Sequence, residues 1–207
     1  GQAFLALLPW SVDRDVVQMV RTGSIAYELL RPLDLQAFWF CRLLGWRLAA
    51  TALRALPLLL LVGVVFRAVG LEQYALPLPP TWANAAAFLL SFALAVPLGV
   101  ALTLLAQATI LWTLRIEGIT RVVPAIVLVC GGMVIPLPLL PPGVATLLYL
   151  LPFRGVVDAP YRAYSGSLAP RDAVIAALGS ALWLLLIVLG SRALLARGLK
   201  RAVVHGG

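Results

Sequence analysis

Side chains able to do acid–base, nucleophilic or metal chemistry are scarce in this chain, and none of them forms a catalytic set. The single histidine, His205, lies in the tail, and Cys41 and Cys130 have no histidine nearby. No GxxxxGK[ST] motif for nucleotide phosphates is present. The acids lie at or beyond the ends of apolar runs: Asp13, Asp15, Glu28, Asp34, Glu72, Glu117, Asp158 and Asp172. We therefore expect no enzymatic activity, no metal site and no cofactor held by the chain itself.

The most polar stretch, which also holds clear helix-capping and helix-ending residues, runs from Arg21 to Asp34, with the sequence RTGSIAYELLRPLD. Ser24 can cap a short helix over Ile25–Arg31, and Pro32 would end that helix. Asp34 can then cap the helix that follows. A short, capped polar helix between apolar segments is suited to contact with a soluble partner at the membrane surface.

Three side chains of this short helix could make such contacts: Tyr27, Glu28 and Arg31. Glu28 and Arg31 are three residues apart, so they could equally pair with each other on the helix surface. For these two charges, docking and pairing stay open as alternatives.

The composition places the rest of the chain in a membrane. Of 207 residues, 62% are hydrophobic and 12% are charged, and the mean hydropathy is +1.01. A soluble domain has roughly 25% charged residues, so this chain lacks the surface of one. Its net charge of +8 comes from basic residues scattered between apolar runs, which favours a role in membrane orientation over nucleic-acid binding.

Apolar runs divide the chain into the segments of one all-α transmembrane domain, residues 1–207. We expect the end of a span at 1–10, a cytoplasmic loop at 11–34, and spans at 35–66, 83–114, 122–140 and 173–190. Between the last two spans, prolines interrupt residues 141–171, which predicts short half-helices and a loop at the outer surface. Residues 191–207 form a basic cytoplasmic tail.

The helix expected over 35–66 is longer than a bilayer is thick. At 1.5 Å per residue it spans roughly 48 Å, against about 30 Å of hydrocarbon. The arginines and aromatic residues of its first half are typical of interfacial anchoring. Arg54 lies deepest, so it either extends toward the interface or faces a polar pathway.

Small residues recur at every fourth position of the 83–114 segment. Such a stripe lets helices approach closely in lipid. It predicts either packing within the subunit or a dimer seam, along Ala87, Ser91, Ala95, Gly99 and Thr103.

The basic residues predict the orientation. With 11–34 in the cytoplasm, most arginines and the lysine fall inside, and a minority fall outside: Arg67, Arg154, Arg162 and Arg171. This bias follows the positive-inside rule. We expect a multi-pass protein of a bacterial plasma (inner) membrane with a cytoplasmic C-terminus.

The order of these features resembles the permease subunits of type-2, exporter-class ATP-binding-cassette transporters, in particular a bacterial branch with the signature R-[ST]-G-x-[IV]-A-x-x-L-x-R-P. Here this pattern reads RTGSIAYELLRP over residues 21–32. The branch also has a Gly-Pro-rich segment leading to outer half-helices and an LPF sequence, as at Gly131–Pro142 and Leu151–Phe153. The resemblance covers nearly the whole chain. It implies a six-span permease, of which this chain holds four complete spans and part of another.

The resemblance implies that a coupling helix in the 11–34 loop docks on a separate ATPase subunit. The residues expected to take part are Arg21, Ser24, Tyr27, Glu28, Leu29, Arg31 and Pro32. It further implies a second permease copy or a sister permease, and ATP with Mg²⁺ bound in the ATPase partner. The apolar pathway suggests an amphipathic or lipid-like cargo.

Two alternatives to an exporter permease stay open from the residues alone. One is a membrane assembly or scaffold protein that transports nothing. The other is an ion-coupled secondary transporter, which the absence of a carboxylate within a span disfavours.

Overall fold

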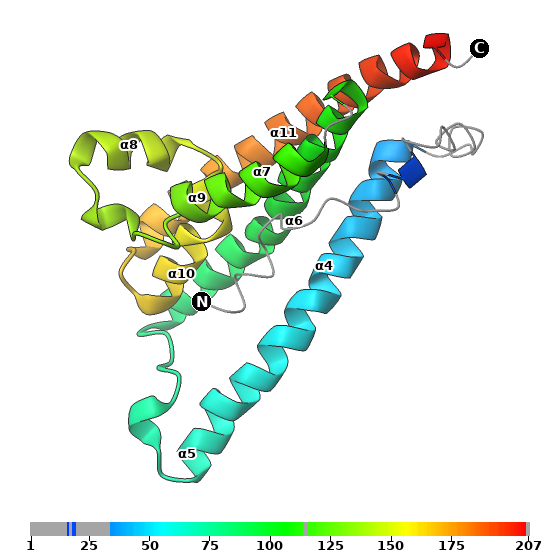
Figure 1. The fold of residues 1–207 in the computed structure, drawn as a ribbon. Helices are drawn as coiled ribbons and strands as arrows, with labels where there is room; N and C mark the ends of the chain where they lie inside the picture. Colours follow the sequence, from blue (N-terminus) through cyan, green and yellow to red (C-terminus); the bar gives the residue numbers. More distant parts are fainter. Residues whose placement is uncertain (1–15, 17, 20–33, 114–115, 206–207) are drawn as a thin grey trace.

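The computed structural model describes residues 16, 18–19, 34–113 and 116–205, which are mostly helical (Figure 1). No strand occurs among these residues, in agreement with the expected all-α class. Three helices in this part of the chain are long and apolar enough to cross a membrane: Leu35–Ala68, Trp82–Thr109 and Pro170–Gly198. The all-α, polytopic membrane architecture is therefore confirmed.

The first long helix consists of α4 (Leu35–Leu60), a π-helical turn η1 (Leu61–Val65) and α5 (Phe66–Ala68). Asp34 caps its start, where Oδ1 accepts hydrogen bonds from the backbone N–H groups of Gln36 and Ala37 at 3.0 and 3.1 Å. The π-helical turn follows Pro57, which lacks the N–H needed for the regular helical hydrogen bond. The helical run nevertheless continues to Ala68, close to residue 66, where the sequence predicts its end.

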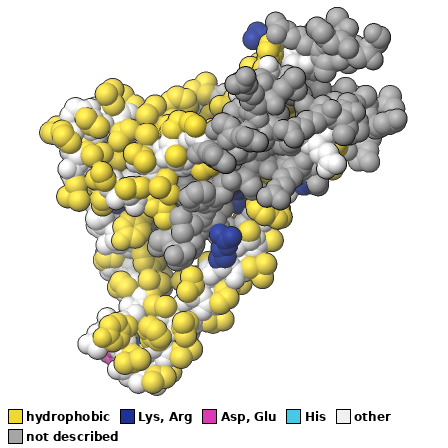
Figure 2. Space-filling view, viewed as in Figure 1, with side chains coloured by type: hydrophobic (Ala, Val, Ile, Leu, Met, Phe, Trp, Pro, Cys, Tyr) yellow, Lys and Arg dark blue, Asp and Glu magenta, His cyan; other side chains and the backbone are white. Residues whose placement is uncertain are grey.

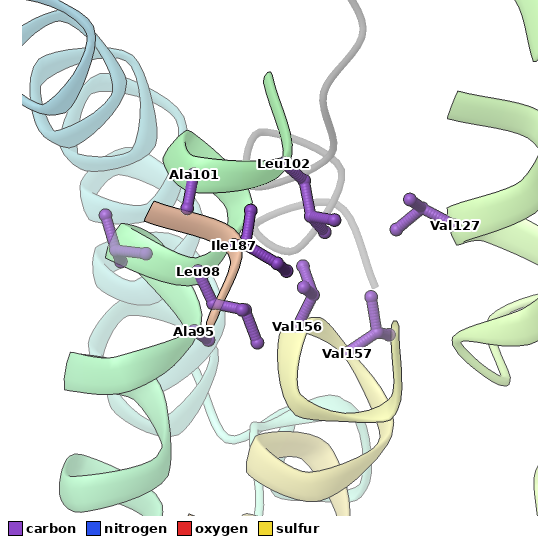
Figure 3. Packing of buried hydrophobic residues seen from close by; sticks show 9 residues of the cluster. Ala95, Leu98, Ala101, Leu102, Val127, Val156, Val157 and Ile187 are labelled. Atoms are coloured by element: carbon purple, nitrogen blue, oxygen red, sulfur yellow. The ribbon is translucent and has the colours of Figure 1, made fainter. Parts of the chain in front are cut away.

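The second long helix, α6 (Trp82–Thr113), is the centre of the molecule. Its buried side chains extend from Asn84 to Ala108. In Figure 3, Leu98 and Leu102 of this helix point toward Val156 and Ile187 from two other segments. Several of the other described helices, α4 among them, therefore share α6 as a packing partner.

The helix expected over 122–140 has different bounds. In the structure α7 runs from Ile116 to Cys130, so residues 116–121, which lie between two expected spans, are helical. The helix ends early because Gly131 and Gly132 follow, and Gly132 has a φ of +79°, which an L residue rarely adopts. At 15 residues, α7 spans only about 22 Å, less than a hydrocarbon core.

Residues 137–165 contain short helices: η3 (Leu137–Leu139), α8 (Pro142–Leu150), α9 (Phe153–Val156) and α10 (Asp158–Ser165). The half-helices and loop expected over 141–171 correspond to α8, α9, α10 and the turn after them. Gly155 and Val156 of α9 are buried, and Gly166, at φ +74°, ends α10 in the left-handed conformation.

The last helix, α11 (Pro170–His205), combines the span expected at 173–190 with most of the expected tail. Residues 191–205 therefore continue the helix instead of forming a separate tail. α11 packs along α6, as Figure 1 shows, and Ile187 belongs to their shared core.

Candidate functional site

One face of α4 carries buried polar side chains where an apolar helix would carry aliphatic ones. Its buried residues are spaced three or four apart, which places them on one side of a helix: Gln36, Trp39, Leu43, Arg47 and Thr51. We call Asp34, Gln36, Arg47 and Thr51 the polar face of α4. Beyond Thr51, the helix exposes Leu53, Leu56, Leu60 and Val64 among other apolar residues. The polar face is therefore confined to the half of α4 that follows the 11–34 loop.

At the start of α4, the polar face contacts α11. Arg192 Nη2 lies 2.8 Å from Asp34 Oδ2, and the side chains are 66% and 43% exposed. An ion pair that is this exposed contributes about 0–1 kcal/mol. Gln36 adds a buried contact, because its Nε2 donates to Val188 O at 2.8 Å and to Ser191 Oγ at 2.9 Å.

Further along, the polar face contacts α6 through Arg47, which is 2% exposed. Arg47 Nη2 donates to Thr103 Oγ1 at 2.9 Å, and Thr103 Oγ1 donates to Gly99 O at 2.9 Å. Arg47 is about 18 Å along the helix from Leu35. A buried cation at this depth in a membrane helix marks a functional region by default.

Two more polar side chains close to this level are buried without a hydrogen bond in the described part of the chain: the Thr51 hydroxyl and the Gln107 amide. Most buried polar groups in proteins are hydrogen-bonded, so such groups point to a partner or a second state. The polar face is thus hydrogen-bonded at Gln36 and at Arg47 Nη2, whereas the Thr51 hydroxyl beyond them has no hydrogen bond within the described residues.

The residues predicted to contact an ATPase, Arg21 to Pro32, lie outside the described residues, so their role stays a prediction. Arg54 is exposed and lies outside the polar face. Its role in a pathway also stays a prediction.

The small-residue stripe is buried inside the chain along its whole length: Ala87, Ser91, Ala95, Gly99 and Thr103. Ala87 packs with Ala163 of α10, Ala95 lies in the core of Figure 3, and Thr103 accepts from Arg47. A second copy could reach this stripe only if these helices separated. The dimer-seam alternative stays a prediction, while packing within the chain describes the present structure.

Arg47 and Asp158 are the site residues that sequence reasoning missed. The sequence predicts Arg47 as an interfacial anchor, although its spacing from Trp39, Leu43 and Thr51 places it on their face. Asp158 falls in a stretch predicted to form half-helices and a loop at the outer surface, yet it is 5% exposed in the structure. The i, i+4 spacing of Arg154, Asp158 and Arg162 was the available signal.

Comparison with protein families gives a match over nearly the whole chain. The profile of the ABC-2 family transporter proteins matches residues 2–206. Searches of curated proteins and of solved structures gave no significant match.

Proposed function

The chain belongs to the ABC-2 family of transporter proteins, and from this premise we propose that it forms the translocation pathway of an ATP-driven exporter. Membership makes it a membrane permease subunit of a transporter. We further propose that it works with a separate ATP-binding-cassette ATPase, in which ATP and Mg²⁺ bind, and with a second permease copy or a sister permease. The membrane proposed is a bacterial plasma membrane, with the C-terminus in the cytoplasm.

The observation that supports coupling is the polar face of α4. This helix follows the 11–34 loop directly, and its first half is hydrogen-bonded to both other long helices. A displacement of the loop would therefore be transmitted through α4 to both α6 and α11. The coupling helix proposed for the loop includes Tyr27, Glu28 and Arg31.

The residues that the structure describes offer little support for ion coupling. Asp158 is the buried carboxylate that a coupling ion would need, but two arginines lie within 4 Å of it. Two guanidinium groups beside one carboxylate repel a cation. An ATP-driven mechanism is therefore better supported than ion-coupled transport.

Co-purification with the ATPase encoded beside it tests this proposal. We expect Glu28→Ala with Arg31→Ala to weaken the complex and to abolish stimulation of ATP hydrolysis. Arg197→Ala is the matched control, because Arg197 is an exposed basic residue on α11 outside the loop. Normal assembly and normal stimulation in the double variant would exclude the coupling role assigned to this helix.

A further inference from the structure

A cavity of about 520 Å³ lies between the segment that follows α7 and the α10 helix. We call it the α10 cavity. One wall is apolar and comes from Gly132, Met133, Pro136 and Pro138. The other wall carries polar and charged groups, from Asp158, Tyr161, Arg162 and Ser167, next to Val157. Its size and its mixture of apolar and convergent polar groups are those of a small-molecule site.

The charges at this cavity do not balance. The Asp158 carboxylate has 4% exposure, and its Oδ2 lies 3.5 Å from Arg154 Nε and 3.7 Å from Arg162 Nη1. Charge-assisted hydrogen bonds are usually about 2.7–2.9 Å long, so both contacts are loose. Neither Asp158 Oδ2 nor Arg154 Nε forms a hydrogen bond within the described residues. Two cations around one acid leave an excess positive charge.

Of the two arginines, Arg162 is the one that presents the excess positive charge to the cavity. Arg154 lies against the Tyr149 ring, with its guanidinium carbon 4.5 Å from the ring centroid, and it does not line the cavity. Arg162 does line it. Its Nη2 donates an ordinary hydrogen bond to Ser167 O at 3.2 Å, whereas its Nη1 lies 3.5 Å from Tyr149 Oη and 3.7 Å from Asp158 Oδ2, both long contacts. Nη1 can therefore turn toward an anion in the cavity.

The surface beside the cavity is apolar. Leu139 is 76% exposed and Leu147 is 66% exposed, and Val134, Ile135 and Leu150 are also exposed. Figure 2 shows hydrophobic side chains over the region of α8. A ligand whose anionic group enters the cavity can therefore lay an apolar chain on this surface.

We propose that the α10 cavity binds the anionic head group of an amphiphile, such as a lipid phosphate, with Arg162 contacting the anion. The apolar part of the ligand lies along Leu139 and Leu147. This inference does not depend on coupling to an ATPase, since it concerns binding by the permease alone.

Binding to the purified full chain in detergent tests the proposal, with three probes: a short-chain phosphatidylglycerol, the matching phosphatidylcholine and inorganic phosphate. We expect phosphatidylglycerol to bind most tightly. Arg162→Gln should weaken its binding roughly 10- to 100-fold, because a hydrogen bond to a charged group is lost. Arg171→Gln, which removes an exposed arginine outside the cavity, should leave the affinity unchanged.

Asp158→Asn gives a test that misfolding cannot imitate. Removing the carboxylate leaves both arginines at the site, so phosphatidylglycerol should bind more tightly than to the wild type. Equal affinity for the two lipids, or unchanged affinity in both the Arg162 and Asp158 variants, would overturn the proposal. If inorganic phosphate binds as tightly as phosphatidylglycerol, the proposal that the ligand is an amphiphile is overturned, and the cavity is assigned to a free anion instead.

Discussion

Arg47 shows how a single side chain connects two membrane helices. Its guanidinium keeps its charge in proteins, so burial requires partners that replace water. Thr103 supplies one partner at 2.9 Å, and the threonine is itself bonded to the carbonyl of Gly99 on its own helix. Losing the hydroxyl would leave a buried charge with one acceptor fewer.

We expect Thr103→Val to lower the free energy of unfolding by about 1.5–3 kcal/mol, the contribution of a hydrogen bond to a charged group. Thermal unfolding in detergent would measure the change. Thr146→Val is the matched control, because Thr146 is exposed and its hydroxyl bonds only the Pro142 carbonyl of its own helix.

The double variant Arg47→Met with Thr103→Val gives a second prediction at the same contact. Removing both polar groups leaves neither of them unpaired. The double variant should therefore lower the free energy of unfolding by less than the two single variants do in sum. Strict additivity would mean that the two side chains do not interact energetically.

Asp158 predicts a pH dependence of binding at the α10 cavity. Burial raises the pKa of Asp158, although the charges of Arg162 and Arg154 oppose this shift. The carboxyl therefore takes up a proton at a higher pH than an ordinary aspartate. Arg154 and Arg162 lie within 4 Å of its carboxylate, and Tyr161 lines the same cavity. α6, which packs against α10, has no ionisable side chain.

Phosphatidylglycerol should accordingly bind more tightly as the pH falls from neutral toward the pKa of Asp158. Protonation removes the negative charge and leaves the two arginines. A titration of affinity against pH measures this effect, and Asp158→Asn should flatten the curve. A curve that keeps its slope in that variant would assign the pH dependence to another group.

At the scale of elements, the short helices between α7 and α11 are part of the packed core. Gly155 of α9 lies against Leu98 of α6 and Ser180 of α11. Leu98 is about 24 Å along α6 from its start, close to the middle of that helix. α9 therefore reaches well into the helix bundle, as a re-entrant segment does when protein covers its backbone.

We expect Gly155→Ala to destabilise the fold by about 1–3 kcal/mol, the usual range for overpacking. A Cβ at this position would lie 2.9 Å from Leu98 Cδ2 and would overlap the Ser180 hydroxyl. Gly179→Ala is the matched control, because nothing lies within 4 Å of its added Cβ. Equal unfolding temperatures for the two variants would show that α9 can move away from α6 at little cost.

At the scale of the whole molecule, the two polar regions lie at different levels of α6. The polar face of α4 contacts its second half, through Thr103, whereas α10 contacts its beginning, where Asn84 Nδ2 donates to Ala163 O at 3.4 Å. If the 11–34 loop is cytoplasmic, the α10 cavity lies toward the outer side.

Cysteine labelling tests this orientation in intact cells. In a variant without Cys41 and Cys130, we expect a membrane-impermeant maleimide to label a cysteine replacing Leu78 and to miss one replacing Arg197. Both positions are exposed, and they lie at opposite ends of the long helices. Labelling of position 197 alone would reverse the predicted topology.

The sequence by itself determined the membrane class, the long helices and the cap at Asp34, because hydropathy, length and local capping depend on neighbouring residues. The start of α6 at Trp82 and the run of α4 to Ala68 follow from such local signals. The RTGSIAYELLRP stretch also indicated the transporter family that the profile match supports.

Only the tertiary structure decided which polar residues are buried and what they face. Arg47 lies against Thr103, 56 positions away in sequence, and Arg54, seven residues after Arg47, is exposed. Gly131 and Gly132 end α7, and the prolines after them divide the segment expected to finish a span. Asp158 is buried because α9 and α10 pack against α6. Burial of a charge depends on contacts between distant segments, which local patterns do not contain.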